Sequence, residues 1–348
     1  MNQPRKFYLA TIICITLLAT SCKDLATKEL NSKEMEKAEY AIVVHGGAGT
    51  ILKKNMTPEK EEEYKDALNK ALDIGEKVLQ EGGSSIEAVE KTIQFMEDNP
   101  LFNAGKGAVF THSGKNELDA SFMYGKDMNA GAVGGITNIK HPISAARAVM
   151  EKSEHVMLSG EGAETFCKEM GLETVDPSYF RTERRWNSLQ RILQSDKDQT
   201  ELSEDDIDKK HGTVGCVALD KDGNIAAGTS TGGMTNKKYG RIGDSPIIGA
   251  GTYADNNTCG VSSTGHGEFF IRFTVARDIA ALMEFQKLPL EEAGRRIINE
   301  RLVEKGGTGG VVALDKYGNI AMPFNTEGMY RGYAKPGERL VKIYKEDD

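Results

Sequence analysis

The chain has 348 residues, enough for one large domain or two ordinary domains with a sizeable apolar core. Its composition is that of a globular protein, although its 38 glycines are many. The formal net charge of -8 argues against a nucleic-acid partner.

The N-terminus resembles a bacterial lipoprotein signal. Arg5-Lys6 precedes an apolar run at 7–19 that is too short to span a bilayer comfortably, and small residues then lead to Cys22. We expect a signal peptide at 1–21, lipidation of Cys22 and a polar tether at 22–39. This places the protein at the cell envelope, with membrane contact only through its N-terminal lipid. An uncleaved anchor or plain secretion is the alternative.

In chain order, a buried strand at 40–44 runs into a glycine loop, His45–Gly49. Thr57 and Pro58 predict the start of one helix, and Ser84 with Glu87 predicts a capping box that begins the next. Further strands are expected at 108–111, 117–124 and 130–139, and further helices from Pro142 and over 161–170.

The second half of the chain begins with a charged run at 195–210, which has almost no apolar content and predicts a mobile linker. Strands at 213–219 and 224–231 flank a turn at 220–223. The segment 215–234 recurs as 310–329, which suggests a symmetric pair of sheets. Helices are expected at 268–284 and 290–303.

Cysteine usage predicts neither a disulfide framework nor a metal site. Cys14 and Cys22 belong to the N-terminal signal, which leaves Cys167, Cys216 and Cys259 without metal-ligand spacing. We expect Cys216, three positions after Thr213 in a strand pattern, to be a small buried apolar residue, and we expect no catalytic metal.

The bond between Gly212 and Thr213 follows the charged run directly and is a candidate for self-cleavage. A cut there makes Thr213 an N-terminal residue that carries both a hydroxyl nucleophile and an amine base. The reference pKa of such an amine is roughly 7.7–8.0, so it is partly deprotonated near neutral pH. The alternative is an ordinary strand threonine, which is how we interpret Thr308 in the repeat.

Six motifs, in order over nearly all the chain from Tyr40, resemble the plant-type L-asparaginase / isoaspartyl peptidase family. They are His45–Gly49, Phe102–Gly107, His211–Gly215, Thr229–Gly233, Arg241–Pro246 and Ser263–Glu268. The resemblance implies an α+β fold, the four-layer αββα sandwich of the N-terminal-nucleophile hydrolases.

The resemblance also implies a precursor that cuts itself into two subunits that stay together. The α subunit is then 40–194, the segment 195–212 is the linker that ends at the cleavage site, and the β subunit is 213–348. An (αβ)2 dimer is expected. The resemblance implies no cofactor for catalysis. It does imply a structural sodium ion, held by backbone carbonyls of the Asn103 loop.

The family roles transfer to matching positions. Thr213 is the nucleophile, Thr231 assists it, and Asn103 helps orient it. Arg241 and Asp244 bind the α-carboxylate and α-ammonium of a β-aspartyl substrate, for which a forked cation and a fixed anion are suited. From spacing alone, the Thr231 hydroxyl also fits a cross-strand pair, and Arg241 with Asp244 fits a local salt bridge in a solvated turn.

The segment Thr264–Gly267 supplies a hydroxyl and glycine N–H groups. By resemblance, Thr264 and Gly265 form the oxyanion hole and Gly267 contacts the substrate. His266 is expected to face solvent or the rim of the pocket.

The sequence therefore predicts a self-processing threonine amidohydrolase that acts on the β-amide of L-asparagine and of β-aspartyl dipeptides. A glycosylasparaginase is the nearest alternative, although Gly212 before the nucleophile favours the asparaginase side. A non-catalytic surface lipoprotein that keeps the fold as a binding scaffold is the alternative from another class.

Overall fold

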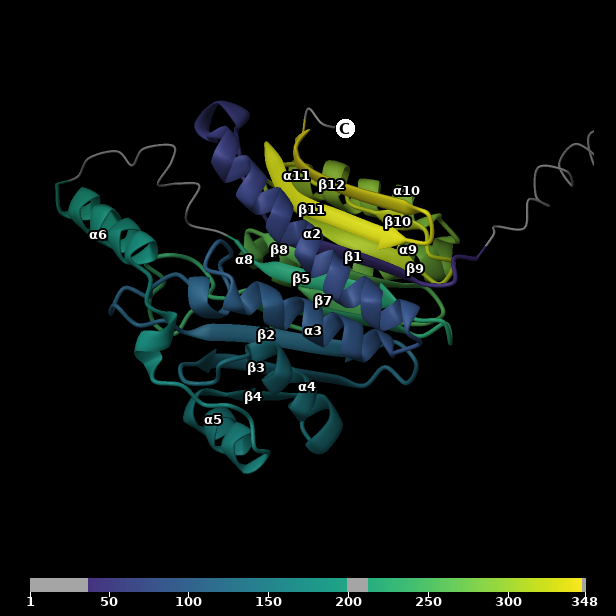
Figure 1. The fold of residues 1–348 in the computed structure, drawn as a ribbon. Helices are drawn as coiled ribbons and strands as arrows, with labels where there is room; N and C mark the ends of the chain where they lie inside the picture. The colour runs from purple at the N-terminus through teal and green to yellow at the C-terminus, as the bar shows by residue number, and fades with distance from the viewer. Residues whose placement is uncertain (1–36, 199–211, 346–348) are drawn as a thin grey trace, which may run out of the picture. The chain divides into compact units, whose positions relative to one another are not determined.

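The computed structural model describes residues 37–198 and 212–345, and the chain from Ala38 onward forms one compact unit (Figure 1). Cys22, the expected signal peptide and most of the expected tether lie outside the described residues. Within the described ranges, no helix is long and apolar enough to cross a membrane.

Eight strands form the larger sheet, in the order β12-β11-β1-β5-β6-β2-β3-β4. Ile42 and Val44 of β1 pack into one apolar core, whereas Ala41 and Val43 pack into another. Successive side chains of a strand point to opposite faces, so this sheet is buried on both sides. The strands are β1 (Ala41–Gly49), β2 (Leu118–Tyr124), β3 (Ala130–Ile136), β4 (Met157–Ser159), β5 (Val214–Leu219), β6 (Ile225–Thr231), β11 (Gly328–Lys335) and β12 (Glu338–Tyr344).

The smaller sheet has the order β10-β9-β8-β7 and stacks on the larger one through the second core. Leu219 of β5 and Val261 of β8 belong to this shared apolar layer. The strands are β7 (Thr252–Ala254), β8 (Cys259–Gly265), β9 (Gly309–Asp315) and β10 (Ile320–Ala321).

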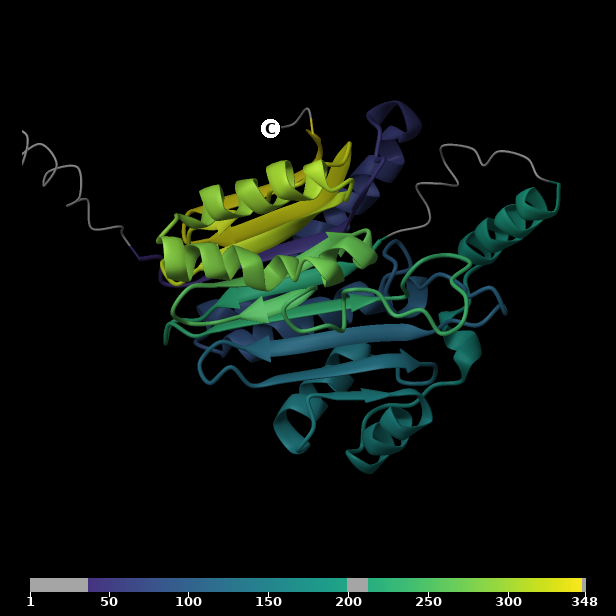
Figure 2. The same ribbon diagram turned by 180° about the vertical axis from the view of Figure 1, so that it is seen from behind.

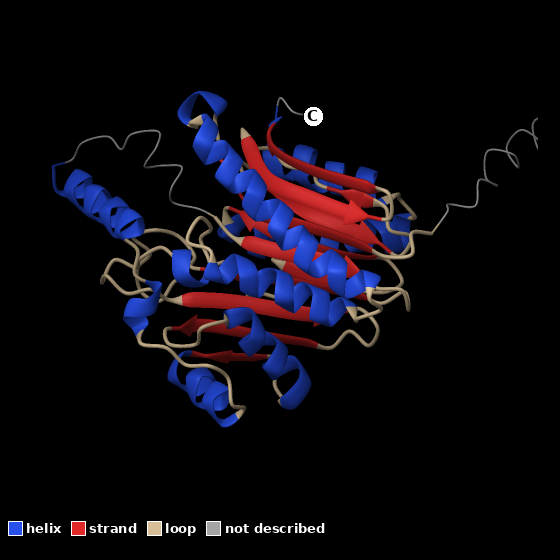
Figure 3. Cartoon of the chain, in the orientation of Figure 1, coloured by secondary structure: helices blue, strands red, loops and turns tan. Residues whose placement is uncertain are grey.

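Helices cover the outer face of each sheet (Figures 1 and 2). On the larger sheet lie α2 (Pro58–Gln80), α3 (Ser85–Asp98) and α4 (Pro142–Lys152), and on the smaller sheet lie α9 (Val275–Gln286) and α10 (Leu290–Arg295). The order helix, sheet, sheet, helix confirms the predicted αββα fold, and Figure 3 shows the strands between the two helical layers. The other α-helices of the described residues are α5 (Gly160–Glu169), α6 (Glu183–Asp198), α8 (Gly267–Arg272) and α11 (Leu302–Glu304), and a π-helix at Arg296–Arg301 joins α10 to α11.

Both predicted helix starts are confirmed. The Thr57 hydroxyl accepts a hydrogen bond from the Lys60 N–H, and the Ser84 hydroxyl accepts one from the Glu87 N–H, each at 3.2 Å. These bonds satisfy N–H groups that the first helical turn leaves without a partner.

Two local predictions in the first half were wrong. The segment His45–Gly49 is not a loop but the end of β1, because its backbone pairs with β11 across a bulge between His45 and Gly47. No strand forms at 108–111, because the Asn116 side-chain amide donates to the carbonyls of Ala108 and Val109 instead of a neighbouring strand.

The predicted helix 268–284 is two helices. Thr274 adopts a left-handed conformation with φ of 45°, which ends α8 and turns the chain into α9. The N–H groups of Ala276 and Arg277, in the first turn of α9, donate to the carbonyls of Ala250 and Gly249. The bonds to that loop stabilise the break.

Helix α6 continues to Asp198, past the predicted start of the linker at Ser195, and the residues 199–211 lie outside the described ranges. The two copies of the repeat fall in different sheets, as β5 with β6 in the larger and β9 with β10 in the smaller. The three cysteines of this unit are buried and unbonded, namely Cys167, Cys216 and Cys259.

Candidate active site

The bond between Gly212 and Thr213 lies at the start of β5, inside a set of hydrogen-bond donors. The Gly212 carbonyl oxygen accepts from Asn103 Nδ2 and from the Thr231 hydroxyl, each at 3.0 Å. Thr213 Oγ1 lies 2.6 Å from the same oxygen and 3.2 Å from Thr231 Oγ1. The Gly233 N–H donates to Thr231 Oγ1 at 3.0 Å, so the single Thr231 proton is directed towards Gly212. Three donors therefore surround the Gly212 carbonyl, which is the predicted cleavage site.

Strand pairing places the two threonines together. In the antiparallel pair of β5 and β6, Val214 lies opposite Ser230, so the adjacent residues Thr213 and Thr231 also meet. Both are buried, with 7% and 2% of their surfaces exposed. The short hairpin that was visible in the sequence is thus sufficient to bring these hydroxyls into contact.

Asn103 and Gly47 approach the same bond from other elements. Asn103 is held by a bond from the Val109 N–H to its Oδ1 at 2.9 Å and by a bond from its Nδ2 to the Gly233 carbonyl at 2.7 Å. Gly47 has φ of +115°, and a Cβ there would lie 3.2 Å from the Gly212 Cα. A side chain at position 47 would be strained in that conformation and would crowd Gly212.

A small cavity beside Thr213 brings together six of the residues predicted for the site. They are Gly212, Thr213, Thr231, Arg241, Asp244 and Gly265, and Gly233, Gly243 and Ser245 complete the lining. Three other predicted residues touch this set without lining the cavity, namely Asn103, Thr264 and Gly267.

Arg241 and Asp244 flank Gly267. A Cβ at Gly267 would lie 2.8 Å from Asp244 Oδ1 and 2.9 Å from an Arg241 terminal nitrogen. The Arg241 guanidinium makes a two-pronged pair with Glu268, at 2.9 and 3.0 Å. Hydrogen bonds from Arg241 lower the pKa of Glu268 to about 2. Arg241, which is predicted to bind a substrate carboxylate, is therefore already oriented by Glu268 of α8, a residue that the sequence prediction did not include.

Asp244 is nearly fully buried, and its Oδ2 has no hydrogen-bond partner among the described residues. Burial raises the pKa of this carboxyl to about 7, although the nearby Arg241 charge acts in the opposite direction. An ammonium group placed in the cavity would supply the missing partner and favour the ionised form.

Thr264 and Gly265 end β8, in the smaller sheet. Gly265 has φ of +151°, and a Cβ there would lie 2.4 Å from the Thr308 carbonyl oxygen, so only glycine fits opposite Gly309. The Thr264 hydroxyl accepts from the Ala48 N–H at 3.3 Å, which ties the end of β8 to β1. The Gly265 backbone reaches the cavity, whereas Thr264 lies beside it.

His266 is 40% exposed at its side chain and lies 3.2 Å from Glu268 Oε2. Its ring also meets Phe269 edge-on. This exposure agrees with the expectation that His266 faces solvent.

A buried chain of hydroxyls, absent from the sequence prediction, lies between the two sheets. His45 Nε2 is 2.9 Å from Ser262 Oγ, which is 2.7 Å from Thr229 Oγ1. Thr252 and Ser121 continue the chain, which ends on the Ser245 carbonyl next to Asp244. Burial lowers the pKa of His45 to about 3, so its imidazole is neutral at ordinary pH.

Glu97 is a second buried group that the sequence analysis missed. Its Oε1 accepts from the Ser230 hydroxyl at 2.6 Å and from the Ile143 N–H at 2.9 Å, and its Oε2 has no hydrogen-bond partner among the described residues. Burial raises the pKa of this carboxyl well above its usual range. Glu97 therefore links β6, directly before Thr231, to the first turn of α4.

The described residues bring no three His, Cys, Asp or Glu side chains together as a metal site. In the Asn103 loop, two glycines pack closely against backbone carbonyls. A Cβ at Gly105 would lie 2.4 Å from the Glu97 carbonyl oxygen, and one at Gly107 would lie 1.9 Å from that of Phe102.

Comparison with known proteins gives one consistent answer. A family model described as asparaginase matches residues 38–342. An Escherichia coli isoaspartyl peptidase is 48% identical over 308 residues, which cover 88% of this chain and 96% of that protein. A Dictyostelium discoideum protein named putative isoaspartyl peptidase/L-asparaginase is 48% identical over 321 residues, which cover 84% and 92%. A Pyrococcus furiosus plant-type L-asparaginase is 42% identical over 306 residues, which cover 85% and 97%. The match over almost the whole folded unit shows that this chain belongs to the asparaginase family.

Proposed function

We propose that this chain is a self-processing threonine amidohydrolase that cleaves the β-amide of L-asparagine and of β-aspartyl dipeptides, releasing L-aspartate. The proposal rests on the contacts of the Gly212 carbonyl oxygen, which accepts hydrogen bonds from the Asn103 amide and from the hydroxyls of Thr213 and Thr231. The relatives named isoaspartyl peptidase and L-asparaginase support the substrate class.

In maturation, the Thr213 hydroxyl attacks the Gly212 carbonyl carbon. The C–N bond breaks, and the hydroxyl proton moves to the leaving nitrogen, which becomes the Thr213 amine. The Asn103 amide and the Thr231 hydroxyl stabilise the oxyanion that forms. Water then hydrolyses the ester and leaves a carboxylate on Gly212.

The strand order supports two subunits that stay together after this cut. The α subunit, 40–194, contributes β1 to β4, and the β subunit, 213–348, contributes β5 to β12. In the larger sheet, β1 lies between β11 and β5, and β6 pairs with β2. The two pieces are interleaved, so backbone ladders of one sheet join them. We extend the proposal to pairing of two such units as an (αβ)2 dimer.

In hydrolysis, the free Thr213 amine accepts the hydroxyl proton, and the oxygen attacks the substrate's side-chain carbonyl. Arg241 holds the α-carboxylate and Asp244 the α-ammonium. The Gly265 backbone and the Thr264 hydroxyl stabilise the oxyanion. Ammonia or an amino acid leaves, and water releases aspartate from the ester.

A structural sodium ion in the Asn103 loop is part of the proposal. Carbonyl oxygens are ligands that a hard cation takes, and glycine at 105 and 107 lets this loop pass close to the carbonyls of Glu97 and Phe102. Sodium would stabilise the loop that positions Asn103. Thermal unfolding in sodium chloride and in a tetramethylammonium salt tests this, and we expect a higher Tm in sodium.

The lipid anchor on Cys22, after signal removal at 1–21, is also proposed, with 22–39 as a tether at the cell envelope. The basic, apolar and small-residue pattern before Cys22 supports it. Mass spectrometry of the membrane-extracted N-terminal peptide tests it, and a Cys22→Ala variant should lose the acyl mass.

The decisive test of the enzyme is intact mass with N-terminal sequencing of the purified protein. We expect two fragments, one beginning at Thr213, and an uncut, inactive Thr213→Ala chain. A wild-type chain that stays uncut for days would overturn the proposal. Rates on asparagine, a β-aspartyl dipeptide and glycosylated asparagine then separate this activity from that of a glycosylasparaginase.

A further inference from the structure

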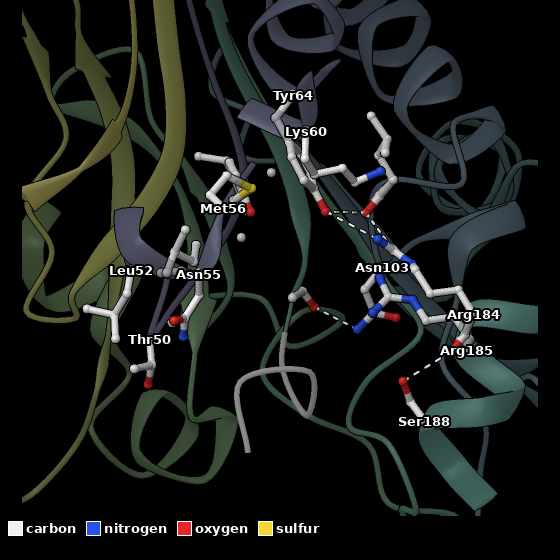
Figure 4. Close-up of a pocket in the computed structure, with 18 residues that line it drawn as sticks. Thr50, Leu52, Asn55, Met56, Lys60, Tyr64, Asn103, Arg184, Arg185 and Ser188 are labelled. Carbon is white, nitrogen blue, oxygen red and sulfur yellow. Dashed lines mark hydrogen bonds between the residues drawn. The ribbon is translucent and has the colours of Figure 1, made fainter. Parts of the chain in front are cut away.

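A second, larger cavity is also lined by Gly212, and Figure 4 shows the side chains around it. Its volume is about 280 Å³, and Gly212 is the residue that it shares with the small cavity beside Thr213. None of its eighteen described lining residues is acidic. In the precursor, Gly212 therefore separates two chemically different spaces.

One wall of the larger cavity is cationic, with Lys60 from α2 and Arg184 and Arg185 from α6. Lys60 is paired with Glu63 at 2.7 Å, and Arg184 is exposed and donates to backbone carbonyls, including that of Leu101 at 2.9 Å. No carboxylate of the described chain pairs with either arginine.

Of the two arginines, Arg185 gives the stronger evidence for a bound anion. Only 7% of its surface is exposed, and its Nε donates to the Gly107 carbonyl at 2.8 Å. Its two terminal nitrogens make no hydrogen bond to any described residue, yet they are not sealed from the cavity. Burial and the neighbouring Arg184 charge lower its pKa to about 10, so it is still a cation at neutral pH. A buried guanidinium with unused donors suits a planar carboxylate.

The opposite wall is mixed. Leu52 and Met56 face the arginines across the cavity, and the polar Thr50 and Asn55 lie beside them (Figure 4). A cationic wall that faces aliphatic side chains suits an amino acid that has a free carboxylate and an aliphatic side chain.

We propose that the larger cavity binds the leaving amino acid of a β-aspartyl dipeptide, with Arg185 and Arg184 taking its α-carboxylate. The inference rests on the proposed function. Self-cleavage frees the end of the chain at Gly212, so the two cavities join at Thr213. A substrate with its α-groups at Arg241 and Asp244 and its carbonyl at Thr213 extends its leaving group towards the larger cavity. Asparagine releases only ammonia, so it has no leaving group that could bind in the larger cavity.

The test compares three substrates: β-aspartyl-leucine, β-aspartyl-leucinamide and asparagine. The amide lacks only the terminal charge, so the ratio of kcat/KM for acid and amide reports the carboxylate contact. We expect the wild-type enzyme to prefer the acid by about 10-fold to about 100-fold, the value typical of hydrogen bonds to a charged group. Arg185→Gln and, as a second variant at an exposed position, Arg184→Gln should bring this ratio close to one.

Asparagine turnover normalises each variant for damage to the Asn103 loop, because Arg185 also anchors Gly107. Arg181→Gln is the matched control, since its guanidinium stacks on Trp186 at 4.2 Å and does not line the cavity. Arg181→Gln should keep the acid preference, and Arg185→Lys should keep part of it.

Equal rates on acid and amide in a wild-type enzyme that turns over asparagine would overturn the inference. So would an acid preference that survives in both arginine variants. If the variants slow self-cleavage but leave the preference intact, the cavity holds the new Gly212 carboxylate instead, and the inference fails. A wild-type enzyme that turns over none of the three substrates would refute the proposed function itself.

Discussion

Replacing Asp244 with Asn should stabilise the fold above pH 7 while removing the anion proposed to bind the substrate ammonium. Asp244 is 5% exposed, and its Oδ2 has no hydrogen-bond partner in the described chain. Burial raises the pKa of its carboxyl to about 7. The ionised carboxylate therefore destabilises the folded state, and the neutral Asn side chain does not.

The size and sign of this effect follow from the pKa. The folded value of about 7 lies roughly three units above the ordinary 3.8, and one unit is about 1.4 kcal/mol, so the full effect is ~4 kcal/mol. Below pH 3.8 the carboxyl is protonated in both the folded and unfolded chain. As pH rises towards 7, the unfolded chain has released the proton and the folded chain has not, so the protein loses stability through this window. Above pH 7 the loss is complete.

The assay is urea unfolding of Asp244→Asn in the Thr213→Ala background, where the chain is expected to stay in one piece. The stability difference from the parent should grow by ~4 kcal/mol between about pH 4 and about pH 8. A buried Asn amide without a partner would add an offset that does not vary with pH. Asp222→Asn, in the exposed turn between β5 and β6, is the control and should show no such slope. A difference that stays constant from acid to alkaline pH would refute burial as the origin of the shift.

Three further outcomes are expected. Thr231→Val should slow self-cleavage by about 100-fold, the usual effect of losing one oxyanion donor, and Thr231→Ser should restore it; band densities over time measure both. Glu97→Ala should destabilise the fold by about 2–4 kcal/mol in urea, because the donors of Ser230 and Ile143 lose their buried acceptor, whereas Glu97→Gln keeps an acceptor and should cost under about 1 kcal/mol. Gly265→Ala should abolish turnover of asparagine, because the added Cβ would lie 2.4 Å from the Thr308 carbonyl oxygen and would displace the backbone beside the cavity. An unchanged kcat/KM for asparagine would contradict this.

Local patterns in the sequence were sufficient for much of the fold. Helix caps such as Thr57 and Ser84 act within one turn, and the β5–β6 hairpin needs only a tight turn between two apolar runs. That hairpin also brought Thr213 opposite Thr231, so the centre of the proposed site could be predicted from neighbouring residues.

The elements that were predicted wrongly are determined by contacts with residues far away in the sequence. Whether His45–Gly49 is a loop or a strand is decided by β11, nearly the whole chain away. The break at Thr274 depends on a loop at 249–250 that meets the first turn of α9. Period and propensity carry no information about such contacts.

The electrostatics of the two cavities could not be predicted from the sequence either, because burial removes water from a charged side chain and so changes its pKa and its need for a partner. In the sequence, Asp244 and Arg185 are ordinary charged residues. In the structure, Asp244 lines one of the two cavities that meet at Gly212 and Arg185 lines the other. An oxygen of Asp244 and the terminal nitrogens of Arg185 have no hydrogen-bond partner among the described residues. Each unpaired charge destabilises the folded protein. A β-aspartyl dipeptide carries an ammonium at one end and a carboxylate at the other, with the scissile carbonyl between them. Under the proposed function, a substrate of that polarity would give each of the two buried groups of opposite sign the partner that it lacks in the free protein.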